Sequence, residues 1–219
     1  MPKAQTSSPG TTTRRPPPDD GGDAGLADGR AWRTVVGIVG LVTLFRLLVL
    51  FASPLELYPD EAQYWLWSRT LAFGYVSKPP LVAWLIAATT VMGRDAEPFV
   101  RLSSPLIHAA TALVLARTGG RLYGPWSGAA AGVLYTLSPG VALSAFVVST
   151  DPALLLGLAL ALWAYATLQD AKGRGRLAAA GFGASLGLAF LAKYAALYAV
   201  IGLAAHLALS REARRAWTP

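Results

Sequence analysis

The sequence predicts an all-α membrane protein, a polytopic helix bundle of about six spans. Of the 219 residues, 54% are hydrophobic and only 14% are charged, and the mean hydropathy is positive at +0.44. These values exceed what a soluble domain of this length needs for its core. The net charge of +7 comes from short basic clusters between apolar runs, which is typical of cytoplasmic loop ends and argues against a nucleic-acid partner. The chain has no cysteine, which excludes disulfides, thiolate catalysis and Cys-ligated zinc.

Residues 1–30 are expected to form a disordered cytoplasmic tail. They are rich in Pro, Thr, Gly and Asp, so they bury too little apolar surface to offset the entropy of ordering. The apolar run 34–52 that follows is about long enough to cross a bilayer, and Arg30 and Arg33 before it should keep its start cytoplasmic. We therefore predict a signal anchor that opens a membrane domain over 31–219.

The first external loop is expected over 53–97, with a short helix at 59–72. Pro59 suits the first turn of a helix, and the aromatic residues that follow are spaced to share one face with Leu71. These aromatics are Tyr64 and Trp67. Because Trp and Tyr favour headgroup depth, the helix should lie in the outer interface.

Residues 81–92 are apolar but short for a span, which is typical of a re-entrant or juxtamembrane helix. If they do not cross, all the basic clusters between later spans fall inside; if they cross, the first two clusters fall outside, against the positive-inside tendency. We therefore predict that both termini are cytoplasmic. After the first span, the expected spans cover 98–117, 125–147, 152–169, 177–193 and 194–210.

This topology brings polar residues that are far apart in sequence to the outer face. They are Asp60, Glu61, Lys78, Asp151 and Lys193. Asp60 and Glu61 begin the loop helix, where the backbone dipole stabilises anions. Asp151 begins a span, and the alternative interpretation is that it is an ordinary structural helix cap. For the loop helix, the alternative interpretation is an aromatic belt with a solvated acidic cap.

Two arginines lie within predicted spans. An intramembrane arginine must reach the interface, pair with an acid or face a polar cavity. Arg101 could simply extend to the outer interface, but Arg46 lies deeper, so each is a candidate contact for substrate. His108 and His206 lack a second histidine at metal spacing, so hydrogen-bonded imidazoles are expected in preference to metal ligands.

Several motifs follow one another in a recognisable order between residues 34 and 210. They are Asp60-Glu-Ala-Gln-Tyr-Trp65, Gly74-Tyr-Val-Ser-Lys-Pro-Pro80, Arg101-Leu102, Ser149-Thr-Asp-Pro152 and Leu188-Ala-Phe-Leu-Ala-Lys-Tyr194. This series resembles the GT-C membrane glycosyltransferases. Within them it is similar to the bacterial glycosyltransferase family 39, a protein-mannosyltransferase-like group that includes lipid A aminoarabinose and galacturonosyltransferases.

The resemblance implies inverting transfer of a sugar from a polyprenyl-phosphate donor to a hydroxyl-type acceptor on a glycolipid, polysaccharide or protein. The active site would face the exterior of the cytoplasmic (inner) membrane. By match to the family motifs, Asp60, Glu61 and Asp151 are the acidic catalytic candidates and Lys78 the phosphate contact. The chemistry needs a base for the acceptor hydroxyl and positive charge for the leaving phosphate, which Asp60 and Lys78 can supply. The remaining substrate-binding candidates are Arg46, Arg101, Tyr64 and Lys193.

In the aminoarabinose branch, an acid before the lysine helps to hold a metal, but here that position is Ser77, which does not support a divalent cation and leaves the cofactor open. Relatives commonly continue through further spans, and we expect this chain to correspond to their N-terminal part. A noncatalytic membrane subunit is the main alternative class. A transporter fits less well, because transporters usually carry charges or broken helices near the middle of several spans, and of the residues singled out only Arg46 fits.

Overall fold

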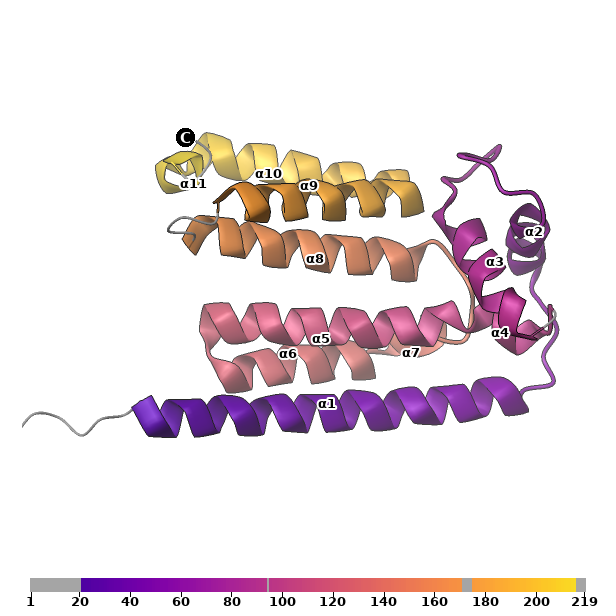
Figure 1. Cartoon of the computed structure of the whole chain (residues 1–219), viewed down its shortest axis with the longest axis horizontal. Helices are drawn as coiled ribbons and strands as arrows, with labels where there is room; N and C mark the ends of the chain where they lie inside the picture. The colour runs from indigo at the N-terminus through magenta and orange to yellow at the C-terminus, as the bar shows by residue number, and fades with distance from the viewer. Residues whose placement is uncertain (1–20, 94, 171–174, 216–219) are drawn as a thin grey trace, which may run out of the picture.

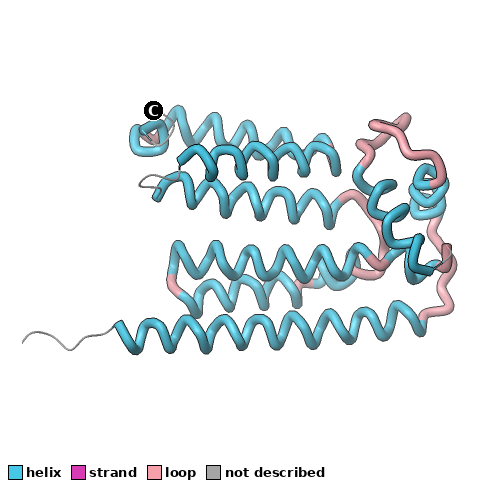
Figure 2. Tube along the Cα trace, in the orientation of Figure 1, coloured by secondary structure: helices cyan, strands magenta, loops and turns pink. Residues whose placement is uncertain are grey.

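The structure, a computed structural model, describes residues 21–93, 95–170 and 175–215. The described residues form helices joined by loops and contain no strand, which confirms the predicted all-α class. Figure 1 shows long helices lying side by side, with three short helices gathered at one end of the bundle. The longest loops gather at the same end, as Figure 2 shows. We call this the loop end.

Six segments run along the bundle (Figure 1). They are α1 (Gly21–Ala52), α5 (Ser103–Tyr123), α6 (Pro125–Leu137) followed by α7 (Pro139–Ser144), α8 (Asp151–Asp170), α9 (Gly175–Ala192) and α10 (Leu197–Leu209). A 3-10 turn, Tyr194–Ala196, joins α9 to α10, and α11 (Arg211–Arg215) follows. Within the described part of the chain, four stretches are long and apolar enough to cross a membrane: Asp28–Ala52, Glu97–Tyr123, Asp151–Gln169 and Gly175–Ala192.

The loop end holds α2 (Pro59–Ser68), α3 (Leu81–Gly93) and α4 (Glu97–Arg101). Because α1 ends there and α5 starts there, α3 does not carry the chain across the bundle, as expected for the segment 81–92 (Figure 1). At the opposite end lie the C-terminal turn of α5, with Arg121, and α11. We call that the basic end. Which end faces the cytoplasm stays a prediction.

The predicted helix over 59–72 ends early, at Ser68. The Ser68 hydroxyl donates a hydrogen bond to the carbonyl oxygen of Trp65 at 2.6 Å. The next two backbone N–H groups donate to carbonyls three residues back, which tightens and ends the helix. Leu71 therefore lies outside the helix and is exposed, so its predicted shared face with Tyr64 was wrong.

The expected span over 125–147 is divided between two separate helices, α6 and α7. Between them Ser138 is extended (φ −64°, ψ 139°), the conformation that a following proline favours. After α7 the chain reaches α8 through a turn and loop. The path still runs from the basic end to the loop end (Figure 1).

The first helix begins before the apolar run. Residues 21–30, which were expected in the disordered tail, are already helical in α1. Ala and Leu in this stretch are good helix formers, so a helix that crosses the membrane can continue beyond it. Residues 1–20 of the predicted tail lie outside the described residues.

The helices pack closely at small residues. A Cβ added to Gly128 of α6 would lie 2.2 Å from the carbonyl oxygen of Ala116 and 2.3 Å from the amide nitrogen of Gly120, both on α5. A Cβ on Gly157 of α8 would lie 2.8 Å from the amide nitrogen of Ala189 on α9. Such contacts let two backbones approach without large side chains between them, as is common in membrane bundles.

Candidate functional site

Asp60 lies in the first turn of α2, at the loop end, and its side chain is exposed. Among the described residues it makes no hydrogen bond or ion pair with another side chain. The unpaired backbone N–H groups of the first helical turn stabilise its negative charge. Asp60 is therefore an exposed carboxyl group at a helix start, within reach of a bound molecule.

Glu61, the next residue, has the opposite environment, because it is fully buried at 0% exposure. Its Oε1 accepts hydrogen bonds from Arg101 Nε (2.9 Å) and from the backbone N–H of Val148 (2.8 Å). Its Oε2 accepts from Arg101 Nη2 (2.7 Å) and from the backbone N–H of Tyr58 (3.0 Å). We call this set of contacts the Glu61 clamp.

Arg101 completes the clamp and is itself 3% exposed. It also donates to the carbonyl oxygens of Leu55 (3.0 Å) and Glu56 (2.8 Å). Of the three fates open to an intramembrane arginine, Arg101 therefore pairs with an acid. The predicted catalytic role of Glu61 and the substrate contact of Arg101 stay untested. Because both side chains already use their hydrogen-bonding groups within the clamp, a positioning role is favoured for both.

Asp151 and Lys193 form an ion pair at 2.6 Å between Oδ1 and Nζ. It joins the start of α8 to the turn that follows α9. The two side chains are 50% and 38% exposed, so solvent reaches both. Unlike the buried residues of the clamp, either side chain of this pair can replace its partner with a bound substrate at little cost in free energy.

Tyr64 packs between the two groups of acids. Its ring is 5% exposed, belongs to a buried cluster with Val82 and Ile86, and lies 5.6 Å from the Trp67 ring centroid. Burial raises the pKa of the Tyr64 phenol, and the nearby charges of Asp60 and Asp151 raise it further. The hydrogen bond from the Val148 N–H to Glu61 also ties the start of α2 to the loop that leads into α8. A substrate contact by Tyr64 itself stays a prediction.

Lys78 is carried by a loop that is organised around Tyr75. The Tyr75 ring stacks on Trp67 at 4.8 Å between centroids, and its hydroxyl donates to the Trp67 carbonyl oxygen (3.0 Å). The Tyr75 N–H donates to the carbonyl oxygen of Lys78 at 3.1 Å, and the following residues 79–80 are buried. The Lys78 side chain is half-buried and makes no hydrogen bond or ion pair within the described residues. Sequence reasoning missed Tyr75, although its place in the Lys78 motif was visible.

An apolar groove of about 560 Å³ adjoins this loop. It is lined by Phe73, Pro79 and Pro80 on one side and by α9 and Tyr194 on the other. Two of its lining residues, Pro79 and Tyr194, directly follow Lys78 and Lys193 in the chain. The groove is therefore apolar along its length, and each of its two sides includes the residue that follows a lysine in the chain.

Arg46 lies away from these groups, buried at 4% exposure. Its Nη2 donates to the carbonyl oxygen of Thr136 at 2.6 Å. That carbonyl lies in the last turn of α6, where carbonyl oxygens have no N–H partner within the helix. Arg46 therefore supplies the missing hydrogen bond at a helix end inside the bundle. Its predicted substrate contact stays untested.

The two histidines are hydrogen-bonded imidazoles, as expected. His108 contacts the Tyr135 hydroxyl (Nδ1, 2.8 Å) and the Ser144 hydroxyl (Nε2, 3.0 Å), which links α5 to α6 and α7. His206 contacts the Tyr165 hydroxyl at 2.7 Å. Within the part of the chain that the structure describes, no group of three or more His, Cys, Asp or Glu could hold a metal.

Comparison with known proteins places this arrangement in a family. Residues 77–218 match the family described as dolichyl-phosphate-mannose-protein mannosyltransferase. The chain belongs to this family. The match confirms the resemblance to GT-C membrane glycosyltransferases, although it begins after Asp60 and Glu61.

The chain is also similar to the lipid A galacturonosyltransferase RgtD of Rhizobium johnstonii. The two are 46% identical over 173 residues, which is 78% of this chain and 36% of the relative. The chain thus spans about a third of the length of this curated relative. No solved structure matches.

Proposed function

We propose that this chain provides the loop-end active site of a glycosyltransferase that moves a sugar from a polyprenyl-phosphate donor to a hydroxyl acceptor. The site would face the exterior of the cytoplasmic membrane. One observation carries most of the proposal: an apolar groove whose lining residues Pro79 and Tyr194 directly follow Lys78 and Lys193 in the chain, at the same end of the bundle as the exposed carboxylate of Asp60. That combination suits a substrate with a hydrocarbon tail and an anionic head.

The donor would place its polyprenyl tail in the groove and its phosphate near Lys78. The Lys78 ammonium has no competing partner among the described residues, so binding phosphate breaks no existing ion pair. As the bond between the anomeric carbon and the phosphate oxygen breaks, the phosphate leaves with the electron pair and gains negative charge. A lysine carried on a loop that is already ordered stabilises that charge more in the transition state than in the bound donor.

The acceptor hydroxyl would approach from the side of Asp60. Asp60 takes its proton while the hydroxyl oxygen forms the new bond to the anomeric carbon, opposite the departing phosphate, which inverts that carbon. Asp151, held by Lys193, would accept hydrogen bonds from sugar hydroxyls. The Glu61 clamp would hold α2, and with it Asp60, in a fixed position relative to the groove.

The relative supplies the first substrates to test. Because it is named a lipid A galacturonosyltransferase, polyprenyl-phosphate galacturonic acid and lipid A are the first donor and acceptor to examine. Single-turnover transfer between them, in membranes that contain the protein, measures the chemical step apart from product release.

Asp60→Asn should lower turnover by roughly 10²–10⁴-fold with donor binding largely retained, the usual share of a general base. Lys78→Ala should weaken both donor binding and turnover, because its charge acts before and during phosphate departure. Glu56→Gln removes another exposed acid of the same loop and should leave transfer near normal. Near-normal transfer by a folded Asp60→Asn protein would remove Asp60 as the base and make Asp151 the next to test. Normal transfer in all of these variants would instead favour a noncatalytic subunit.

A further inference from the structure

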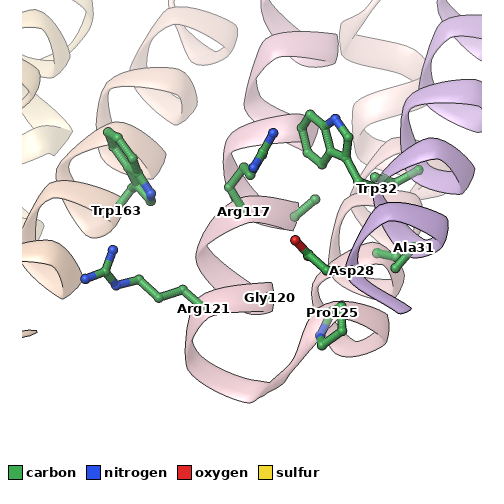
Figure 3. A pocket seen from close by; sticks show the side chains of 11 residues that line it. Asp28, Ala31, Trp32, Arg117, Gly120, Arg121, Pro125 and Trp163 are labelled. Atoms are coloured by element: carbon green, nitrogen blue, oxygen red, sulfur yellow. The ribbon is translucent and has the colours of Figure 1, made fainter. Parts of the chain in front are cut away.

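A second cavity lies at the basic end, away from the candidate site. It has a volume of about 340 Å³ and lies between α1, α5 and α6, with Trp163 of α8 at its edge (Figure 3). Ligand-binding cavities usually begin at about 300 Å³, so it is large enough for a small ligand or a headgroup. None of the roles assigned above uses it.

Arg117 is held in this cavity by an aromatic ring. Its guanidinium carbon lies 3.7 Å from the centroid of the Trp32 ring, a close cation–π contact. This contact holds the guanidinium carbon over the ring without using the N–H groups for hydrogen bonds. Arg117 is exposed and makes no hydrogen bond or ion pair with another described residue. Its planar fork is therefore directed and available to bind an anion by two hydrogen bonds.

The surrounding charge favours an anion. Arg121, one helical turn beyond Arg117, also lines the cavity, and Asp28 is its acidic residue (Figure 3). Arg30 and Arg33 belong to the same stretch of α1 as Asp28. The segments 28–33 and 117–121 together carry four arginines and one aspartate, a net charge of +3. A phosphate here would meet a positive field as well as the stacked guanidinium.

The depth and the floor of the cavity point to a lipid. Trp32 and Trp163 lie on either side of it, and indole rings favour the headgroup region of a bilayer (Figure 3). Arg117 lies six residues before the end of α5, about 9 Å along the helix at 1.5 Å per residue. The rest of the wall includes the methyl groups of Ala31, Ala116 and Ala129. A basic rim above an apolar wall matches a molecule that is anionic at one end and hydrocarbon at the other.

We propose that this cavity binds the phosphodiester headgroup of an anionic glycerophospholipid from the leaflet at the basic end. Arg117 and Arg121 hold the phosphate oxygens, and the acyl chains leave along the apolar wall. Free phosphate offers the same anionic chemistry but gains nothing from that wall. The cavity lies at the opposite end from the proposed sugar-transfer site and shares no residue with it, so a test of lipid binding does not depend on the proposed function.

Native mass spectrometry of the purified full chain tests the proposal with phosphatidylglycerol and phosphatidylcholine of the same chain length. The chain should bind phosphatidylglycerol at least tenfold more tightly, and Arg117→Ala should lose roughly tenfold of that affinity, the usual effect of losing hydrogen bonds to a charged group. Arg117→Lys keeps the charge but not the fork, and should lose part of the affinity. Arg211→Ala removes an exposed arginine at the same end but outside the cavity, and should stay within about twofold of the parent chain because it breaks no such bond.

Arg117 is exposed, so its variants should fold, and thermal unfolding without lipid verifies this. Equal affinity for the two lipids, or unchanged affinity in a folded Arg117→Ala chain, would overturn the proposal. Inorganic phosphate offers a further test. If millimolar phosphate raised the unfolding temperature as much as phosphatidylglycerol does, the ligand would be a soluble anion and the lipid assignment would be wrong.

Discussion

Replacing Arg101 by methionine should destabilise the folded chain severely, because it leaves the Glu61 carboxylate buried at 0% exposure without its counter-ion. Removing one partner of a buried ion pair costs about 3–5 kcal/mol, since the remaining charge stays desolvated. Met fills a similar length, so the loss reflects charge and hydrogen bonds more than packing. Glu61→Gln keeps the shape but leaves the Arg101 guanidinium, 3% exposed, without its counter-ion, so it should also cost about 3–5 kcal/mol.

The double variant separates the pair from its surroundings. With Glu61→Gln present, Arg101→Met no longer strands a charge, so the double variant should cost less than the two single costs added together. The difference should be roughly 1–3 kcal/mol, the range for residues that share a network. Unfolding by increasing mole fractions of SDS in mixed micelles measures each free energy. Tryptophan fluorescence reports it, because Trp65 and Trp67 lie on α2 beside the clamp.

The ion pair between Arg69 and Asp95 provides a matched control, since its side chains are 39% and 36% exposed and 2.8 Å apart. Asp95→Asn should cost less than about 1 kcal/mol, as exposed pairs do. Asn also tolerates the positive φ of 66° at this position. Single costs for Arg101 and Glu61 that add within about 0.5 kcal/mol would contradict the clamp. So would an Arg101→Met cost no larger than that of Asp95→Asn.

Three further predictions concern packing, topology and the exposed ion pair. Gly128→Ala should destabilise the chain by about 1–3 kcal/mol in the same SDS titration, because its Cβ meets the α5 backbone, whereas Gly183→Ala, with open space around it, should be neutral or slightly stabilising. Single cysteines at Met92 and Tyr123, which are 75% and 77% exposed, should differ: an impermeant thiol reagent should label only the first in intact cells, and the reverse pattern would invert the topology. Asp151→Asn should cost less than about 1 kcal/mol of stability yet lower sugar transfer, and unchanged transfer would remove it from the site.

The positions of the long helices could be predicted because a bilayer fixes how long an apolar segment must be. The expected spans 98–117 and 152–169 lie within observed helical stretches for this reason. The break between α6 and α7 was missed, because composition stays apolar through 125–147. Pro139 was the available signal, since a proline disfavours helix at the residue before it.

Asp60 and Glu61 show why the site could be predicted only in part. The sequence placed both acids at one end of the bundle, but neighbouring residues on a helix point in different directions, and only packing decides which one is buried. The partner of Arg101 was equally hidden, because an acid 40 positions earlier is chosen by three-dimensional geometry. Tyr75 likewise gains its place only from stacking on Trp67.

The Glu61 clamp also sets an order of events during synthesis. Its partners come from residues 55–58, from Arg101 and from Val148, so the last of them leaves the ribosome long after the first. Until Val148 arrives, one acceptor position of the Glu61 carboxylate must be filled by water, because a bare carboxylate in an apolar setting costs far more. A nascent chain that ends before Val148 would therefore carry Asp60 on a hydrated, incompletely anchored helix. The contacts of the loop end are complete only when the chain has been made as far as Val148.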